Sequence, residues 1–276
     1  MLAHTTHINC NIDSDWVVFV HGAGGSSTIW HKQIKSFKEH FHILLVDLRG
    51  HGQNKVIEEI NTKLVYSFSS ISDEIIEVLD SIKIKKAHFI GVSLGTILIR
   101  ELIDSHPERI LKTVLTGTII RLNSYSIILI KVGNTTKRFV PFMILYKIFA
   151  FVIMPRENHK KSRNIFIKEA KKLKQTEFLR WFNLTKTLNN NLKVYAKKLH
   201  HFPVLYLMGR QDHLFINDSM EMAKLEQNSK LEIIENCGHI VIIEQAEIFN
   251  LKAIAFLKEN YSTNQNYPKV ISEKLI

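Results

Sequence analysis

The chain of 276 residues is long enough for one large α/β domain, or for one domain that carries an insertion. Hydrophobic residues make up 45% and charged residues 23%, which excludes a disordered chain, a collagen-like repeat and a disulfide-stapled miniprotein. The two cysteines, Cys10 and Cys237, are too few for a disulfide framework and favour a reducing compartment. The N-terminus has no basic region followed by an apolar run, so we expect a cytoplasmic protein without a secretory signal.

The net charge of +11 is unevenly distributed along the chain. Residues 121–200 contain 18 Lys and Arg against three acids, and the rest of the chain is mildly acidic. Such a segment can meet nucleic acid, anionic lipid or acidic ligands, but we favour a solvated helical face. No nucleic-acid-binding motif accompanies it, so no nucleic-acid partner is expected. The apolar residues 139–154 are too few for a membrane span and include Pro141 and Lys147.

Six short apolar runs predict strands that are buried on both faces of a parallel sheet. They are residues 16–20, 43–46, 88–92, 111–115, 203–208 and 231–235. Amphipathic helical patterns lie between or after them, over residues 70–82, 94–105, 217–225 and 244–258. This alternation predicts βαβ units with helices on both faces of the sheet.

Residues 119–199 interrupt the alternation. Apolar side chains from Phe178 to Leu199 recur at three- and four-residue steps, and residues 139–154 form a second helical pattern. We therefore expect a helical cap over 119–199, a core made of 1–118 and 200–261, and a polar tail over 262–276. The cap aromatics could line an acyl pocket or pack inside the cap, and we favour packing; they are Phe139, Phe142, Phe149, Phe151 and Trp181.

The strongest chemical signal is the pentapeptide Gly91-Val92-Ser93-Leu94-Gly95, which follows a predicted strand and opens a predicted helix. A serine on such a tight turn has a strained backbone and an outward hydroxyl, and the flanking glycines remove Cβ atoms that would collide with the neighbouring elements. The helix start adds positive potential for developing negative charge. Ser93 is therefore the candidate nucleophile.

A nucleophilic serine needs a base, and the base needs an orienting acid. His239 follows the last predicted strand, and we choose it as the base. Asp212 follows the strand at 203–208 and is the candidate acid, because the strand at 111–115 ends in residues without a carboxylate. The chain order is then Ser93, Asp212, His239. We expect four other histidines to be solvent-exposed and without a role; they are His159, His200, His201 and His213.

Acyl transfer also needs donors for the oxyanion. The backbone N–H of Leu94, directly after the nucleophile, is one candidate. The glycine-rich loop His21-Gly22-Ala23-Gly24-Gly25 offers the second, and we choose Ala23 ahead of Gly22. The chain lacks the phosphate-binding patterns of nucleotide sites, so neither a cofactor nor a metal is expected.

Taken together, these segments resemble the serine-nucleophile branch of the α/β-hydrolase superfamily. FVHGAGGSSTIW is similar to its oxyanion loop, VDLRGHGQN to its D-x-R-G-H-G turn, FIGVSLGT to its nucleophile elbow, FPVLYLMGRQDHL to its acid loop and NCGH to its histidine loop. The resemblance covers about residues 16–118 and 200–258. It implies an eight-stranded, mostly parallel sheet flanked by helices, with a cap between strands 6 and 7, and it implies the same five site residues.

Three departures from the family pattern accompany this resemblance. Gln53-Asn54 follow the D-x-R-G-H-G turn, Thr96 follows the elbow, and only fifteen residues precede the first clear strand, so the first hairpin must be short or incomplete. None removes a catalytic group. We interpret Asp47, Arg49 and His51 as structural residues.

The sequence thus predicts an esterase-like serine hydrolase that cleaves a small carboxylic ester, with an amphipathic or anionic substrate suggested by the basic, apolar cap. The same triad could act on a thioester, a lactone or a C–C bond, because fold does not decide the substrate. A hydrolase-like protein that only binds a ligand is the non-enzymatic alternative. Weak contact of the basic cap with a membrane surface is a further hypothesis, and the oligomeric state stays open.

Overall fold

The computed structural model describes residues 1–54, 66–137, 139–197, 202–226 and 228–259. Its centre is a seven-stranded sheet in the order β1-β3-β2-β4-β5-β6-β7, in which all neighbours are parallel except β1 and β3. The strands are β1 (His4–His7), β2 (Trp16–Val20), β3 (His42–Val46), β4 (Ala87–Val92), β5 (Ile110–Thr116), β6 (Val204–Gly209) and β7 (Ser229–Ile234).

The strand count differs from the eight that the family resemblance implies, because the described residues form seven. The difference lies at the N-terminus, where β1 alone precedes β2 and pairs antiparallel with β3, with His4 opposite Val46. The short N-terminal segment therefore supplies one edge strand where a hairpin would supply two. β1 has no apolar run, and its sequence pattern did not reveal it.

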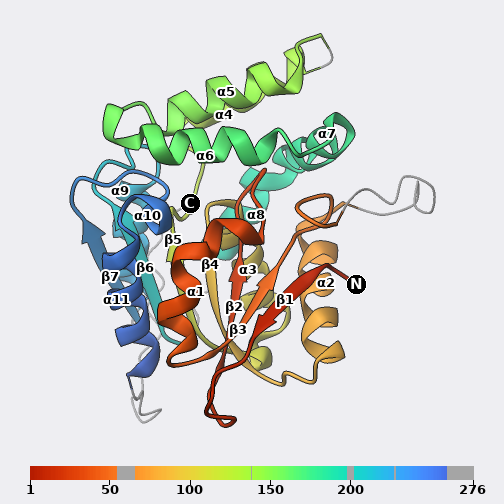
Figure 1. Cartoon of the computed structure of the whole chain (residues 1–276). Helices are drawn as coiled ribbons and strands as arrows, with labels where there is room; N and C mark the ends of the chain where they lie inside the picture. The colour runs from red at the N-terminus through yellow and green to blue at the C-terminus, as the bar shows by residue number, and fades with distance from the viewer. Residues whose placement is uncertain (55–65, 138, 198–201, 227, 260–276) are drawn as a thin grey trace.

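Helices cover both faces of the sheet, as the alternation predicted (Figure 1). Along β2, Val17 and Phe19 pack in one hydrophobic cluster with α1 (His31–Lys38) and α11 (Ala246–Lys258). Val18 and Val20 pack in the other with α2 (Phe68–Ser81) and α3 (Leu94–Ser105). Because successive strand residues point to opposite faces, each central strand feeds both clusters.

The predicted helix at 244–258 is α11 (Ala246–Lys258), which begins two residues later than its pattern indicated. Gln245 has φ −133° and ψ 54°, which is not helical, and it separates α10 (Val241–Glu244) from α11. The remaining body helix, α9 (Ile216–Leu225), agrees with its pattern to within one residue. Three short 3-10 helices complete the described elements: η1 (Ser27–Trp30), η2 (Pro107–Arg109) and η3 (Glu157–His159).

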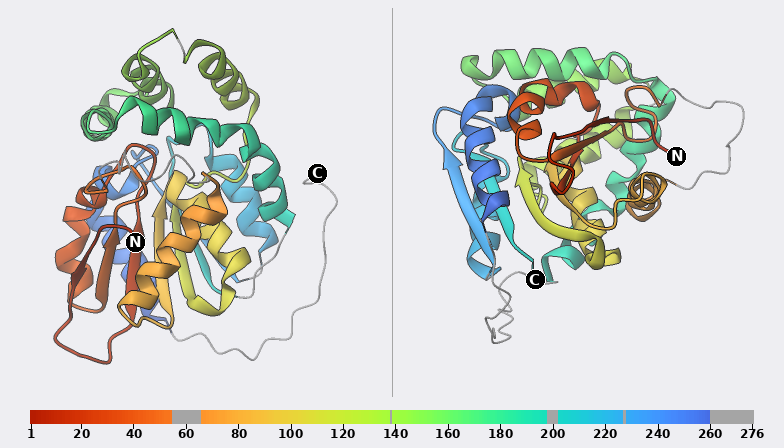
Figure 2. Two further views of the ribbon diagram at one scale, coloured as in Figure 1. Left: turned by 90° about the vertical axis from the view of Figure 1, so that its right-hand side faces the viewer. Right: turned by 60° about the horizontal axis from the view of Figure 1, so that its bottom comes forward.

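Between β5 and β6 the described residues form helices and no strand; the α-helices are α4 (Ser124–Thr136), α5 (Phe142–Ile153), α6 (Lys160–Ala170), α7 (Gln175–Asn183) and α8 (Thr185–Lys197). We call this segment the helical insertion. Figures 1 and 2 show α4, α5 and α6 together on one side of the sheet, while α8 runs down beside the body. Leu188, Leu192 and Tyr195 of α8 share a hydrophobic cluster with α2 and α3, so α8 packs in the body core. The proposed tail at 262–276 lies outside the described residues.

No helix in the described ranges has both the length and the apolar character needed to cross a membrane.

Candidate active site

Ser93 lies between the end of β4 and the start of α3, where the chain turns sharply. Its backbone has φ 54° and ψ −118°, a conformation that residues other than glycine rarely adopt. A Cβ on Gly95 would lie 2.3 Å from the Val20 carbonyl oxygen, and one on Gly91 would lie 2.9 Å from the Gly95 carbonyl carbon. Two glycines thus allow the turn, and β4 and α3 fix the serine at the carboxyl edge of the sheet.

Asp212 and His239 meet on the loops that follow β6 and β7. Both side chains are buried, and His239 Nδ1 donates a hydrogen bond to Asp212 Oδ2 at 2.8 Å. This contact directs Nε2 away from the carboxylate, and Nε2 is buried with no hydrogen-bond partner in the described part of the chain. The arrangement fits an imidazole that an acid orients and that keeps one nitrogen free to take a proton.

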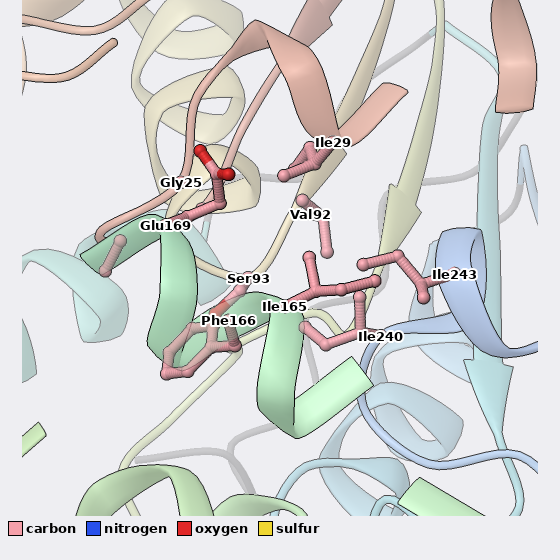
Figure 3. Close-up of a pocket in the computed structure, with 11 residues that line it drawn as sticks. Gly25, Ile29, Val92, Ser93, Ile165, Phe166, Glu169, Ile240 and Ile243 are labelled. Carbon is pink, nitrogen blue, oxygen red and sulfur yellow. The ribbon is translucent and has the colours of Figure 1, made fainter. Parts of the chain in front are cut away.

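The third contact of the predicted triad is not formed, because no described group bonds to His239 Nε2, the hydroxyl of Ser93 included. Ser93 and His239 nevertheless adjoin the same segment: the Ser93 N–H donates to the Thr116 carbonyl at 3.0 Å, and a Cβ on the next residue, Gly117, would lie 3.0 Å from His239 Cε1. Ser93 and Ile240, the residue after His239, line one cavity (Figure 3). Hydrogen bonds between catalytic groups are often long before substrate binds.

Gly117 is a site residue that the sequence reading missed. It follows β5 with φ 54°, and a Cβ there would lie 3.0 Å from His239 Cε1 and 2.6 Å from the His239 carbonyl oxygen. Only glycine leaves room for the histidine loop at this point. The signal was available, because Gly117 ends a predicted strand at the same sheet edge as Ser93.

The glycine-rich loop after β2 lies beside the serine. A Cβ on Gly22 would lie 3.2 Å from Ser93 Cβ, and Ala23 lines the same cavity as Ser93. The Gly24 N–H donates to His51 Nε2 at 3.0 Å and the Gly25 N–H donates to the Gly22 carbonyl at 3.1 Å. These two amides are therefore in use, and the oxyanion role of the Ala23 and Leu94 N–H groups stays a prediction.

Two buried histidines hold this loop in place. His21 Nδ1 donates to the Gly22 carbonyl and its Nε2 accepts from the Leu48 N–H. His51 Nδ1 donates to the Arg49 carbonyl while its Nε2 accepts from the loop. Burial lowers the pKa of His21, and burial together with the nearby His21 lowers the pKa of His51 to about 3, so both rings are neutral.

Asp47 and Arg49 also act structurally. Asp47 accepts from the backbone N–H groups of Ser27 (2.6 Å) and Gln53 (2.8 Å), which ties the turn after β3 to the start of η1. Arg49 forms an ion pair with Glu74 of α2 at 2.9 Å. The structural interpretation of Asp47, Arg49 and His51 agrees with these contacts, and their role is to support the oxyanion loop.

The cavity beside Ser93 is partly open to solvent, its empty space with the open mouth included is about 370 Å³, and its walls are mostly apolar. Figure 3 shows side chains from the body and from α6 gathered around Ser93. The lining residues are Gly22, Ala23, Gly25, Ile29, Val92, Ser93, Ile165, Phe166, Glu169, Ile240 and Ile243. None of the five aromatic residues that we considered for an acyl pocket is among them. Phe139 and Phe151 are exposed, and Trp181 is buried and donates to the Arg49 carbonyl.

Glu169 of α6 is the one ionisable side chain in the described wall of this cavity. Its carboxylate accepts from Ser26 Oγ at 2.8 Å and Thr28 Oγ1 at 3.3 Å, and Lys172 Nζ donates to both oxygens. Burial alone would raise the pKa of Glu169, but the hydrogen bonds from Lys172, Ser26 and Thr28 outweigh it and lower that pKa below its usual value. The carboxylate is therefore ionised and paired.

The helical insertion also contacts the catalytic loops, through a histidine that the sequence reading placed in solvent. His159 is fully buried, and its Nε2 donates to Gln211 Oε1 at 2.8 Å, beside the candidate acid. Asn158 donates to the same Gln211 oxygen and to the Asn236 carbonyl. The expectation for His159 was wrong because η3 packs directly on both loops. His213 is exposed, as expected, and His200 and His201 lie outside the described residues.

A strained serine at the end of a parallel strand, a buried acid–imidazole pair and a glycine-rich loop together define the α/β-hydrolase fold. The family model of this fold matches residues 15–138. The chain also matches the solved structure of a hydrolase from Pseudomonas aeruginosa with a TM-score of 0.79, 19% identity and 94% of each chain covered. For the enol-lactonase from Burkholderia xenovorans the TM-score is 0.75, with 20% identity over 94% of this chain and 96% of that one.

Curated sequence relatives point the same way. The chain is 27% identical over 271 residues to 2-hydroxy-6-oxononadienedioate/2-hydroxy-6-oxononatrienedioate hydrolase from Burkholderia vietnamiensis, covering 88% of this chain and 86% of that protein. It is 33% identical over 91 residues to 3-oxoadipate enol-lactonase 1 from Acinetobacter baylyi, a match that spans only 32% of that protein. These matches show the α/β-hydrolase fold and support a hydrolase.

Proposed function

We propose that the protein is a serine hydrolase that cleaves carboxylic esters, with Ser93 as nucleophile, His239 as base and Asp212 as orienting acid. The observation that carries the proposal is the buried His239–Asp212 pair with its free Nε2. The strained Ser93 lines a cavity together with Ile240, the residue after His239. The substrate is a small-molecule ester, and acyl or lipid-like esters belong to the same class. The chemistry needs neither metal nor organic cofactor.

The reaction proceeds in two steps. Ser93 Oγ attacks the ester carbonyl carbon while His239 Nε2 takes the hydroxyl proton, and the N–H groups of Ala23 and Leu94 bind the oxyanion. Collapse of the tetrahedral intermediate breaks the bond to the alcohol, which leaves with the proton from His239. Water then attacks the acyl-enzyme while His239 takes a proton from the water. His239 returns this proton to Ser93 Oγ as the carboxylic acid leaves.

Three alternatives use the same site. A thioester or a lactone would follow the same acyl-transfer steps, and a lactone is favoured among them because enol-lactonases occur among the similar proteins. The substrate in the name of a relative is a dioate, and hydrolysis of a C–C bond in such a compound would place a carboxylate near Ser93. Glu169 and the mostly apolar walls of the cavity oppose such a substrate, and they equally oppose an anionic group bound inside the cavity.

The test is labelling with a fluorophosphonate, read by intact mass. We expect one adduct on the wild type and none on Ser93→Ala. Ser105→Ala is the matched control, because Ser105 lies at the exposed end of α3 and only bonds the Glu101 carbonyl. Labelling of Ser93→Ala, or no label on a folded wild type, would refute the assignment and leave the ligand-binding alternative.

Turnover then separates the substrate classes. A series of neutral esters of increasing acyl length, a lactone and a thioester, each compared with Ser93→Ala, ranks the acyl substrates. We expect short and medium neutral acyl chains to have the highest kcat/KM, because the cavity is small and its walls are mostly apolar.

A further inference from the structure

The outer surface of the helical insertion is formed by α4 and α5, and it is unusually apolar. The two helices lie farthest from the sheet in Figures 1 and 2. Seven of the thirteen exposed large apolar side chains in the described residues fall within this short stretch. They are Tyr125, Ile128, Val132, Phe139, Ile144, Ile148 and Phe151. A contiguous apolar patch on a water-facing surface marks an interaction site.

These side chains follow one face of each helix. On α4 the exposed positions Tyr125, Ile128 and Val132 are three and four residues apart. On α5 the exposed residues Ile144, Ile148 and Phe151 have the same spacing, while Tyr146, Ala150 and Ile153 on the opposite side are buried against the rest of the protein. We call the two exposed stripes, together with the exposed Phe139 in the turn between the helices, the α4–α5 outer face. One side of α5 packs inward, and the other side presents apolar groups to water.

The charged residues within the segment that carries this face have a single sign, although Arg121 at its start is paired with Asp218 and Glu221 of α9. Residues 121–156 contain six Lys and Arg and no Asp or Glu. Lys131 on α4 and Lys147 on α5 are exposed between the apolar positions of the same two stripes. Lysines beside aromatic and aliphatic side chains on a surface helix are the pattern of helices that lie in the interface of an anionic bilayer.

We propose that the α4–α5 outer face docks on the surface of an anionic phospholipid bilayer. The apolar side chains enter the boundary between headgroups and acyl chains, and Lys131 and Lys147 contact lipid phosphates. Charge complementarity selects this occupant over a second copy of the chain, since a symmetric dimer would bring two basic, acid-free faces together. The helices lie on the membrane, because neither has the length of a span.

Docking would also hold the candidate active site near the bilayer. Tyr146, on the buried side of α5, donates to the Ala23 carbonyl at 2.7 Å, so the helix that meets lipid also contacts the oxyanion loop. The docking surface itself includes none of the residues that line the Ser93 cavity. The proposal therefore stands independently of the reaction at Ser93.

The test is flotation of the full chain with unilamellar vesicles of phosphatidylcholine alone, or of phosphatidylcholine and phosphatidylglycerol in equal amounts. One variant combines Tyr125→Gln, Ile128→Gln and Phe139→Gln, and a second combines Lys131→Gln and Lys147→Gln. The matched control combines Leu251→Gln and Lys258→Gln, which removes an exposed leucine and an exposed lysine from α11, away from the insertion.

We expect the wild type and the control to bind the anionic vesicles, and to bind phosphatidylcholine at least about tenfold more weakly. Both α4–α5 variants should lose about tenfold in binding to the anionic vesicles, with unchanged melting and unchanged turnover of a soluble ester. The proposal would be overturned if the wild type did not bind the anionic vesicles, or if both variants bound them as strongly as the wild type does. A dimer in light scattering that the apolar variant converts to a monomer without any vesicle binding would also overturn it, because a second copy would then cover the face.

Discussion

The carboxyl edge of the sheet and the helical insertion contribute to the candidate site in different ways. At the sheet edge, backbone geometry holds the reactive groups: Ser93 has a strained turn, and Gly95 and Gly117 leave space that no Cβ could share. The insertion contributes side chains, with Phe166 and Glu169 in the cavity wall. The reaction therefore depends on features that tolerate little change, whereas the choice of substrate depends on side chains that can be exchanged.

The largest contrast is expected between two glycines. Gly95→Ala would place a Cβ 2.3 Å from the Val20 carbonyl oxygen, and the backbone there cannot move without disturbing β2. Gly133→Ala in α4 would meet Phe182 Cζ at 2.5 Å, the far end of a side chain that can shift by a change in χ1, and alanine also favours the helix. We expect Gly95→Ala to lose more than about 3 kcal/mol of unfolding free energy and nearly all activity. Gly133→Ala should stay within about 1 kcal/mol of the wild type. Equal losses of unfolding free energy in the two variants, measured by urea titration, would contradict the difference that we expect between the sheet edge and the insertion.

Acid should destabilise the sheet edge through its neutral histidines. The pKa of His51 is lowered from 6.5 to about 3, and that of His21 is also lowered, so the unfolded chain binds more protons than the folded protein in this window. The contribution of the two neutral histidines to the free energy of unfolding is therefore complete above pH 6.5. It falls as the pH drops below 6.5, by about 1.4 kcal/mol per pH unit for each histidine.

Urea titrations from pH 7.5 to pH 4.5 measure this slope. His51→Gln should be less stable at neutral pH but should show a shallower slope, because one buried titrating ring is gone. His40→Gln, at an exposed position, is the control and should keep the wild-type slope. An unchanged slope in His51→Gln would contradict the account of the oxyanion loop.

The insertion should determine charge selectivity through Glu169. Nitrophenyl pentanoate and the monoester of nitrophenol with glutaric acid differ mainly in a terminal carboxylate. We expect the wild type to favour the neutral ester, and Glu169→Gln to narrow the ratio of kcat/KM values about three- to tenfold, since Lys172 then loses its partner. Glu157→Gln, an exposed acid of the insertion, is the control. If neither variant changes the ratio of the two kcat/KM values, Glu169 does not determine the preference for the neutral ester.

The smallest effect is expected for the contact between α5 and the oxyanion loop. Tyr146→Phe removes the hydrogen bond to the Ala23 carbonyl and leaves the ring in place. Because one buried hydrogen bond contributes about 1 kcal/mol, kcat should fall only a few-fold, with little change in KM. Tyr125→Phe, on the exposed side of α4, should change neither constant. A rise in KM that exceeds the fall in kcat would indicate that the Tyr146 hydroxyl contacts the substrate instead.

The sheet edge was readable from sequence because each of its features has a local signature. The apolar runs gave six strands to within two residues, and the elbow pattern gave both Ser93 and the start of α3. Asp212 and His239 followed from their positions after strands, and the structure brings these two together. The contact from His239 to Ser93, and with it the complete triad, stays a prediction.

The insertion was less readable because its contacts are tertiary. Nothing in the sequence around His159 distinguishes it from an exposed loop histidine, yet η3 places it against Gln211 on the acid loop. Helical spacing located α7 and α8, but it could not tell that α8 packs in the body core and α4 faces water. The cavity wall of Ile165 and Phe166 depends on where α6 crosses the sheet edge, which no local pattern encodes.

The backbone of Ser93 has a last consequence, for how this protein can change over generations. A serine at φ 54° and ψ −118° raises the free energy of the folded state by about 1–3 kcal/mol relative to a relaxed residue. Glycine would adopt the same angles without that strain. Selection for stability alone would therefore favour glycine at this position, and a serine is retained there only as long as the protein needs its hydroxyl group.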